Sequence, residues 1–268
     1  MDFGGIVLHA SQFRGSARIG RHKHSDAYVC FLVGGPLRER VGDRVWSHFP
    51  QTTIVHPAGE EHDDDFGGPA LCVNLKISSQ WIGRHLDDAG LWPERRAFEN
   101  GPMFVLGLRL LHLYKRHELG LVPLDVEEIV AEFFFTGQSA MKHRPKTWRI
   151  SRVMERLDSD PTTPARLSEC ANLVGVHPVY LARMFRKSAG MSLGEYQRHA
   201  RLRRAISLLA GTRDPISLVA LECGYSDQSH LTHVLKRHTG FTPLALRSCC
   251  SVTTGLVRRI QDPRLRQE

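Results

Sequence analysis

Residues 224–247 read GYSDQSHLTHVLKRHTGFTPLALR and carry, within 24 residues, a glycine turn, a polar cap, an amphipathic run, a second glycine and a group of cations. Residues 175–192 read GVHPVYLARMFRKSAGMS and show the same order of features. One pattern written twice predicts that the chain builds the same structural unit twice.

The two copies align with a single insertion. Gly175 corresponds to Gly224 at an offset of 49 residues, whereas Leu181 corresponds to Leu231 at an offset of 50. One residue is therefore inserted in the turn, and the remainder of each copy stays in register.

Each copy predicts two helices joined by a turn. A polar residue before a proline, at Thr163 and at Asp214, signals the start of the first helix. A glycine then ends this helix in a left-handed conformation that other residues adopt only with strain. The second helix is predicted over residues 177–188 and 226–238. This is the order of a helix-turn-helix, whose second helix enters the major groove of DNA.

Helical periodicity separates the two faces of each second helix. The inward faces are apolar: Leu181, Met184 and Phe185 in the first copy, and Leu231, Val234 and Leu235 in the second. The outward faces offer arginine for guanine, glutamine for adenine and small apolar groups for the thymine methyl. Candidate base readers are Val179, Ala182, Arg183, Arg186, Gln228, Ser229, Thr232 and His233, and candidate phosphate contacts are Lys187, Lys236 and Arg237.

Residues 193–210 lie between the two copies and predict a connecting helix. About 16 helical residues at 1.5 Å each span roughly 24 Å, which suits two recognition helices about one DNA turn, ~34 Å, apart. Its arginines suit either phosphate contacts or a solvated face. The alternative for the whole region is a pair of helical hairpins with solvated outer faces.

Charge is divided unevenly along the chain. Residues 1–143 hold 15 Lys and Arg against 18 Asp and Glu, a net charge of −3, while residues 144–268 hold 21 against 10, a net charge of +11. This asymmetry favours an acidic partner for the C-terminal half, and double-stranded DNA fits the repeated motif.

Other features narrow the class of protein. The longest apolar run, FVLGLRLLHLY, is interrupted by Arg109, so no membrane helix or membrane partner is expected. The N-terminus lacks the basic start of a signal peptide, which favours the cytoplasm. Six cysteines without a CxxC pair argue against a disulfide framework or structural zinc.

The N-terminal half predicts a different architecture. Short extended runs separated by glycine and proline turns over about residues 6–78 are typical of a small antiparallel barrel or sandwich. Helical spacing follows over about residues 79–141, and these helices are expected to pack on the β domain or pair subunits. A polar, basic segment marks a linker at 142–149, followed by the helical domain at 150–250 and a tail at 251–268.

The sequence GYSDQSHLTHVLKRHTGFTP resembles the signature of AraC/XylS-type transcriptional regulators, and residues ~148–247 resemble their double helix-turn-helix domain. The resemblance implies sequence-specific DNA binding, contact with RNA polymerase and a homodimer. The family usually has arginine at the position of His233 and serine at the position of His177, so the second helix reads guanine less directly here.

The N-terminal half resembles the cupin-like β-barrel of the same family. His22 and His24, with residues 57–62, are similar to the two cupin motifs. Metal-binding cupins place a glutamate several residues after the histidine pair, and this chain has Tyr28 there. The missing carboxylate favours a barrel without metal or other cofactor, in which His22, His24, Tyr28 and His62 line an effector pocket. A three-histidine metal site at His22, His24 and His62, and a purely structural or dimerising barrel, remain open.

We therefore expect an α+β chain of two domains, a cupin-like β-barrel with helices followed by an all-α double helix-turn-helix. The expected function is a transcriptional regulator controlled by a small-molecule effector or by dimerisation, and not an enzyme. Two alternatives remain: a metal-dependent cupin enzyme or sensor fused to a DNA-binding domain, and a sequence-neutral DNA binder.

Overall fold

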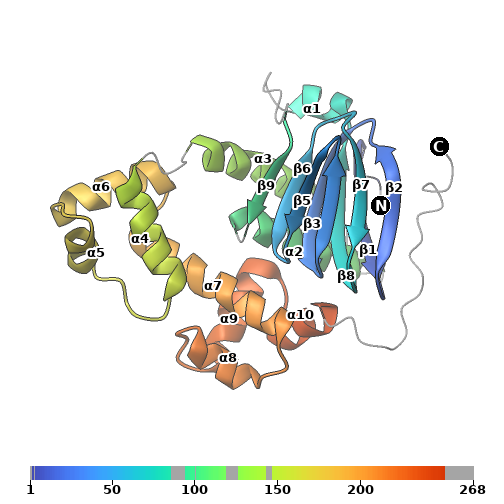
Figure 1. Cartoon of the computed structure of the whole chain (residues 1–268). Helices are drawn as coiled ribbons and strands as arrows, with labels where there is room; N and C mark the ends of the chain where they lie inside the picture. Colours follow the sequence, from blue (N-terminus) through green and yellow to red (C-terminus); the bar gives the residue numbers. More distant parts are fainter. Residues whose placement is uncertain are drawn as a thin grey trace. The chain divides into compact units, whose positions relative to one another are not determined.

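The computed structural model describes residues 2, 4–85, 94–99, 101–118, 126–142 and 147–250. The chain divides into two compact units, residues 1–131 with 248–268, and residues 132–247 (Figure 1). Residues 143–146 of the predicted linker and the whole of the predicted tail lie outside the described residues. The domain limits drawn from the sequence therefore stay a prediction.

The first unit is built around nine described strands. They are β1 (Ile6–Phe13), β2 (Ala17–Lys23), β3 (Ala27–Gly34), β4 (Leu37–Val41), β5 (Arg44–His48), β6 (Thr52–His56), β7 (Glu61–Phe66), β8 (Ala70–Ile77) and β9 (Arg96–Glu99). All named pairs are antiparallel, in a five-stranded sheet of order β1-β8-β3-β6-β9 and a four-stranded sheet of order β2-β7-β4-β5.

The two sheets face each other across a shared core. Cys30, Leu32 and Ile54 of the larger sheet are buried in one cluster with Leu37 and Phe66 of the smaller sheet. Tyr28 at the start of β3 packs against the same cluster. The space between the sheets therefore holds the side chains that the sequence assigns to an effector pocket.

The sequence-based prediction of a closed barrel is wrong. Among the described residues no strand of one sheet pairs with a strand of the other, so the sheets form a sandwich. Alternating buried and exposed residues occur in both architectures, and closure depends on strand partners that alternation does not encode. The α+β class of the chain, with a sheet-rich first part and a helical second part, is confirmed.

Helices cover the outer face of the larger sheet. The helices of this part of the chain are α1 (Ser79–His85), α2 (Pro102–Glu118) and α3 (Val126–Lys142), and the division between the units falls within α3. Helix α2 packs on β1, β3, β6, β8 and β9. A Cβ atom at Gly107 would collide with the ring of Phe31, so this glycine lets the helix approach the sheet closely.

The second unit consists of helices. They are α4 (Trp148–Ser159), α5 (Leu167–Leu173), α6 (Pro178–Ala189), α7 (Leu193–Gly211), α8 (Ile216–Glu222), α9 (Gln228–Thr239) and α10 (Pro243–Cys250), the last ending beyond the unit. Helix α5 packs on α6, and α8 packs on α9, as a helix-turn-helix requires. The described residues contain no helix that is both long enough and apolar enough to cross a membrane.

The predicted limits of the two second helices are confirmed within two residues, as α6 and α9. The turns are confirmed too, because Gly175 has φ +65° and Gly224 has φ +75°. The predicted start of the first helix at Thr163 is wrong: α5 begins at Leu167, and Thr163 instead donates its backbone N–H to the Asp160 carboxylate.

Candidate functional site

Helix α6 presents its predicted base readers to solvent. Its first turn is capped by His177, whose Nδ1 accepts a hydrogen bond from the backbone N–H of Val179 at 3.3 Å. Leu181 and Phe185 are fully buried, which fixes the rotation of the helix. The predicted contacts all lie on the exposed side: Val179, Ala182, Arg183, Arg186 and Lys187. Tyr180, which the sequence analysis did not single out, is 58% exposed beside them.

Helix α9 presents a more polar set. Its cap is Asp227, whose Oδ1 accepts the backbone N–H of His230 at 2.8 Å. Leu231 and Leu235 are fully buried and hold the helix in the same rotation as α6. One shallow hollow brings together all six candidates of this helix: Gln228, Ser229, Thr232, His233, Lys236 and Arg237. The Thr232 hydroxyl donates to the Gln228 carbonyl at 2.8 Å, so its methyl group is the better placed contact for a base.

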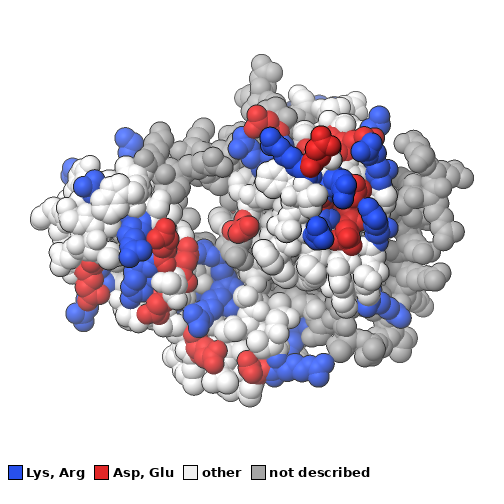
Figure 2. Space-filling model, in the orientation of Figure 1, with Lys and Arg blue, Asp and Glu red and all other residues white. Residues whose placement is uncertain are grey.

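The electrostatics of the two units differ. On the face drawn in Figure 2, acidic and basic side chains lie close together over the sheets, while larger basic groups lie over the helices. In β7, for example, Asp63 lies 3.9 Å from Arg18 and 3.8 Å from Arg40. Neutralisation inside the first unit leaves the helical unit as the one whose surface charge suits an anionic partner.

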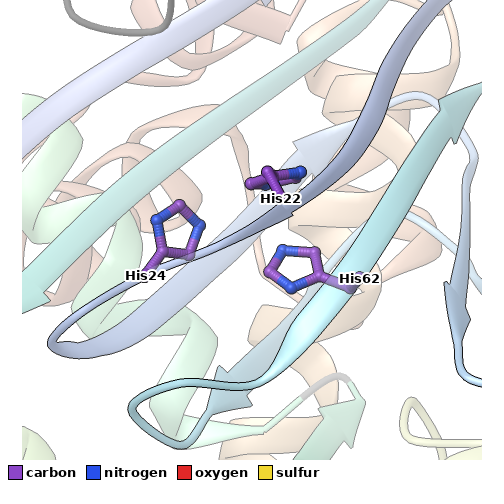
Figure 3. A group of neighbouring side chains, drawn as sticks. All are labelled: His22, His24 and His62. Atoms are coloured by element: carbon purple, nitrogen blue, oxygen red, sulfur yellow. The ribbon is translucent and has the colours of Figure 1, made fainter. Parts of the chain in front are cut away.

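Three histidines meet between the sheets of the first unit (Figure 3). His22 on β2 lies opposite His62 on β7, and His24 follows the end of β2. One ring nitrogen from each of the three lies within 4.8 Å of the others. The sequence-predicted cluster is therefore brought together by the strand register.

Hydrogen bonds orient two of these rings. His22 Nδ1 lies 2.9 Å from the Gly20 carbonyl oxygen, and His62 Nδ1 lies 3.3 Å from the Glu60 carbonyl oxygen. A carbonyl only accepts, so each Nδ1 donates and each neutral ring carries its lone pair on Nε2. The His62 Nε2 atom, and that of His24, are buried without a hydrogen-bond partner among the described residues.

Burial keeps His24 and His62 neutral. Burial, followed by the charge of Lys76 and by His22, lowers the pKa of His24 to about 3. Burial, followed by the neighbouring His56 and His22, lowers the pKa of His62 to about 4. Neutral imidazoles with a free Nε2 are the form that binds a transition metal.

Tyr28 is occupied elsewhere. Its hydroxyl donates to Asn74 Oδ1 at 2.7 Å, and Asn74 Nδ2 donates to the Ser11 hydroxyl at 3.0 Å. Its ring stacks on His24 with 4.1 Å between the centroids. Tyr28 thus lines the site as a fixed wall, and its hydroxyl is engaged with the larger sheet.

A buried ion network that the sequence analysis missed lies next to the histidines. His56 contacts Glu60 Oε2 through Nδ1 at 2.7 Å and Glu39 Oε1 through Nε2 at 3.1 Å. Glu39 also pairs with His48 at 2.9 Å and with Arg95.

The charges of this network follow from its contacts. Although burial opposes the charged form, the two carboxylates raise the pKa of His56 to about 9. Burial likewise opposes ionisation of Glu39, yet contacts with His48 and His56 lower the pKa of that carboxyl. His56 therefore lies beside a carboxylate at each of its ring nitrogens, which favours its protonated form. No sequence motif marks Glu39 or His56, since only the strand register brings them together.

Asp64 adds a carboxyl group to this site. The run Asp63, Asp64 and Asp65 lies within β7, and Asp64 is buried. Its Oδ2 lies 4.0 Å from His22 Nε2, and burial together with the charge of Glu39 raises the pKa of Asp64 to about 7. The site therefore has a carboxyl group, contributed by a different strand from the one expected.

The cavity beside these groups is small. It has a volume of about 40 Å³ and is lined by His22, His24, Tyr28, Glu39 and Asp64, among others. Organic ligands usually occupy pockets of about 300 to 1,000 Å³. In this conformation the cavity admits water or a single ion, and an organic effector would need the sheets to separate.

Comparison with known proteins identifies the helical unit. Residues 170–248 match the family model described as a helix-turn-helix domain. The chain is 28% identical over 222 residues to the HTH-type transcriptional regulator RipA of Corynebacterium glutamicum, an alignment that covers 82% of this chain and 61% of RipA. It is 30% identical over 94 residues to the HTH-type transcriptional activator RhaR of Escherichia coli K12, covering 35% of this chain and 33% of RhaR.

The chain thus spans less than two thirds of the length of these regulators. Among solved structures, ToxT from Vibrio cholerae gives a TM-score of 0.38 at 12% identity, over 94% of this chain and 100% of that one. A superposition with that score does not establish a shared arrangement of domains or a shared ligand.

Proposed function

We propose that this chain is a member of the AraC/XylS family of transcriptional regulators and that it binds promoter DNA sequence-specifically through α6 and α9. The observation that carries the proposal is the repeated helix-turn-helix. Both second helices are anchored by buried apolar side chains, and all predicted contacts are exposed except Thr232, which is half-buried. We infer a regulator and not an enzyme, acting in the cytoplasm, where the chromosome lies.

The proposed roles follow from chemistry and position. Arg183 on α6 and Gln228 on α9 suit bidentate contacts with guanine and adenine. Lys187, Lys236 and Arg237, in the later turns of the two helices, suit phosphates, which position the protein without reading sequence. Recruitment of RNA polymerase and homodimerisation complete the proposal, as the resemblance implies.

Selection from random duplex DNA with the full-length chain tests the proposal. We expect a defined sequence, bound at least ~1,000-fold more tightly than unrelated DNA, with a log–log salt slope of several units. A fragment of residues 145–268 should retain this affinity, and residues 1–143 should lack it. Equal affinity for all sequences would instead support an architectural DNA binder.

Control by the first unit is the second part of the proposal. An effector bound beside His22, His24, Tyr28 and His62, or dimerisation through this unit, would change how the helical unit meets DNA. Two observations favour the alternative in which the first unit is a metal sensor. The cavity is small, and the Nε2 atoms of His24 and His62 have no hydrogen-bond partner among the described residues, so the effector would be a divalent transition metal ion.

The residues fit such an ion. His22, His24 and His62 would hold it through Nε2, the Gly20 and Glu60 carbonyls would orient two of the rings, and Asp64 would supply negative charge nearby. A bound ion would supply positive charge at the point where β2 and β7 meet.

Elemental analysis separates an organic from a metal effector. A metal-responsive regulator should contain about one zinc, manganese or iron per chain, lost in the variant His22→Ala with His24→Ala. A protein with substoichiometric metal, whose DNA affinity does not respond to added metal, would leave the organic effector. In either case the double variant should change only the response to effector, because the helical unit is untouched.

A further inference from the structure

The four arginines of the middle of α7 have different environments. Arg198 and Arg204 are exposed, whereas Arg201 and Arg203 are half-buried. Arg203 pairs with Asp158 at the end of α4. Within the described chain Arg201 forms no ion pair with a carboxylate, and its guanidinium donates to backbone oxygens instead.

Those oxygens come from two separate segments. Arg201 Nε donates to the Pro161 carbonyl at 2.8 Å, and Nη2 donates to the Thr162 carbonyl at 2.8 Å, just before the first helix-turn-helix. Nη1 donates to the carbonyl of Gly224 at 3.2 Å, in the turn of the second helix-turn-helix. One side chain therefore contacts both the segment that leads into the first helix-turn-helix and the turn of the second.

Close packing accompanies these bonds. A Cβ atom on Gly224 would lie 3.2 Å from Arg201 Nε and 3.3 Å from the Thr162 Cα atom. At Gly175, in the corresponding turn of the first helix-turn-helix, a Cβ atom would meet nothing within 4 Å. The turn of the second helix-turn-helix thus packs against the guanidinium and against the segment that leads into the first helix-turn-helix.

One helical turn earlier, Gln197 holds the same entry segment. Its Oε1 accepts the backbone N–H of Ala165 at 3.1 Å, and its Nε2 donates to the Pro161 carbonyl at 3.0 Å and to the Thr163 carbonyl. Gln197 is only 7% exposed. The segment is therefore fixed on α7, so that the contact of Arg201 with Gly224 joins two held elements.

We propose that Arg201 is a positioning residue that fixes the separation and orientation of α6 relative to α9. The planar fork of a guanidinium suits three fixed acceptors, which a single ammonium group cannot match. Without the bonds from Arg201 to the carbonyls of Pro161, Thr162 and Gly224, each helix-turn-helix keeps its own core, but the two lose a shared contact.

The inference rests on the proposed function, because its benefit is simultaneous binding of two half-sites. Two linked contacts gain affinity only when their spacing matches that of the target. Arg201→Met removes the donors at similar length, and Arg204→Met removes an exposed arginine three residues further along α7 as a matched control for charge.

The experiment uses the full-length chain and the duplex selected with it. For Arg201→Met we expect an affinity for the complete site that falls about 10- to 100-fold, while affinity for a duplex with either half-site alone changes less than about threefold. The loss caused by inserting one base pair between the half-sites should shrink. Arg204→Met should weaken complete and single half-sites by the same small factor.

Equal losses on complete and single half-sites for Arg201→Met would overturn the proposal, since Arg201 would then be an ordinary phosphate contact. An unchanged complete-site affinity would overturn it as well. If Arg201→Met fails to fold, Arg201→Lys is read in its place, with the same pattern expected at smaller size. Failure of both to fold would show a role in folding and not in positioning.

A measurement without DNA separates this inference from the proposed function. Spin labels on unnatural amino acids at Val179 and Ser229 report the distance between α6 and α9 in the free chain. We expect a narrow distance distribution in the parent chain and in Arg204→Met, and a broad one in Arg201→Met. A chain that selects no DNA sequence would refute the proposed function, whereas equally narrow distributions would refute the positioning role.

Discussion

In the first helix-turn-helix, α6 is capped by an imidazole and exposes Val179, Tyr180 and Arg183 in its first two turns. In the second, α9 is capped by a carboxylate and exposes Gln228 and Ser229. The buried positions match closely, since Leu181 and Leu231 are both fully buried, as are Ala171 and Ala220. One scaffold thus carries two different exposed surfaces, and the proposed function then predicts an operator of two unlike half-sites.

The largest expected difference between the two helix-turn-helix motifs concerns their turn glycines. Gly175 and Gly224 both have positive φ, but only Gly224 is packed against Arg201. Gly175→Ala should cost about 1 kcal/mol in the free energy of unfolding from backbone strain alone, and Gly224→Ala about 3 kcal/mol. Urea unfolding of both variants measures the two values.

A double-mutant cycle sharpens this comparison. The excess cost at Gly224 should fall in a chain that already carries Arg201→Met, because the added methyl group then meets the Thr162 Cα atom but no longer the guanidinium. Equal costs at the two glycines in the parent chain would mean that the close approach at Gly224 contributes nothing.

The caps of the two second helices differ in strength. The bond from the backbone N–H of Val179 to His177 Nδ1 is long, at 3.3 Å, whereas Asp227 accepts the backbone N–H of His230 through a carboxylate oxygen at 2.8 Å. Hydrogen bonds to an ionised acceptor are the stronger ones, and the backbone N–H of His230, followed by the Ser226 hydroxyl, lowers the pKa of Asp227. We therefore expect loss of the cap to cost more at α9 than at α6.

Amide hydrogen exchange, corrected for intrinsic rates, tests this expectation. In Asp227→Ala the protection of the first turn of α9 should fall roughly fivefold, and in His177→Ala that of the first turn of α6 should fall by a smaller factor. Equal losses at the two helices would contradict the distinction between the caps.

The smallest expected effect concerns α5 and α8, the first helices of the two helix-turn-helix motifs. Leu218 and Leu221 of α8 are 42% and 60% exposed, and their counterparts in α5 are Glu169 and Asn172. Leu218→Glu with Leu221→Asn should change the free energy of unfolding by less than about 0.5 kcal/mol and leave DNA affinity unchanged. A loss above 1 kcal/mol in thermal or urea unfolding would mean that this face of α8 packs against another part of the protein.

The sequence predicts the helical unit well because its signals are local. Glycines at a fixed offset and leucines three and four apart specify turns and buried faces without long-range information. The sequence does not separate Arg201 from Arg198 on α7, since the partners of Arg201 are backbone carbonyls more than twenty residues away.

The first unit is harder to predict for the same physical reason. His22, His24 and His62 are found because two motifs mark them, but Glu39, His56 and Asp64 meet only through strand register. Whether two sheets close into a barrel likewise depends on pairing between distant strands. Local alternation predicts which side chains are buried and leaves their neighbours undetermined.

A base-by-base scan of the selected operator tests the central claim most directly. The affinity of the parent chain, Arg183→Ala, Gln228→Ala and Arg186→Ala is measured for every single substitution in the site. We predict that Arg183→Ala and Gln228→Ala each lose about 1 to 3 kcal/mol of base preference, at separate positions in half-sites roughly one helical turn apart, while Arg186→Ala weakens all sequences more evenly. Unchanged base preferences in both Arg183→Ala and Gln228→Ala, or a loss at the same positions for both, would contradict two independent reading helices.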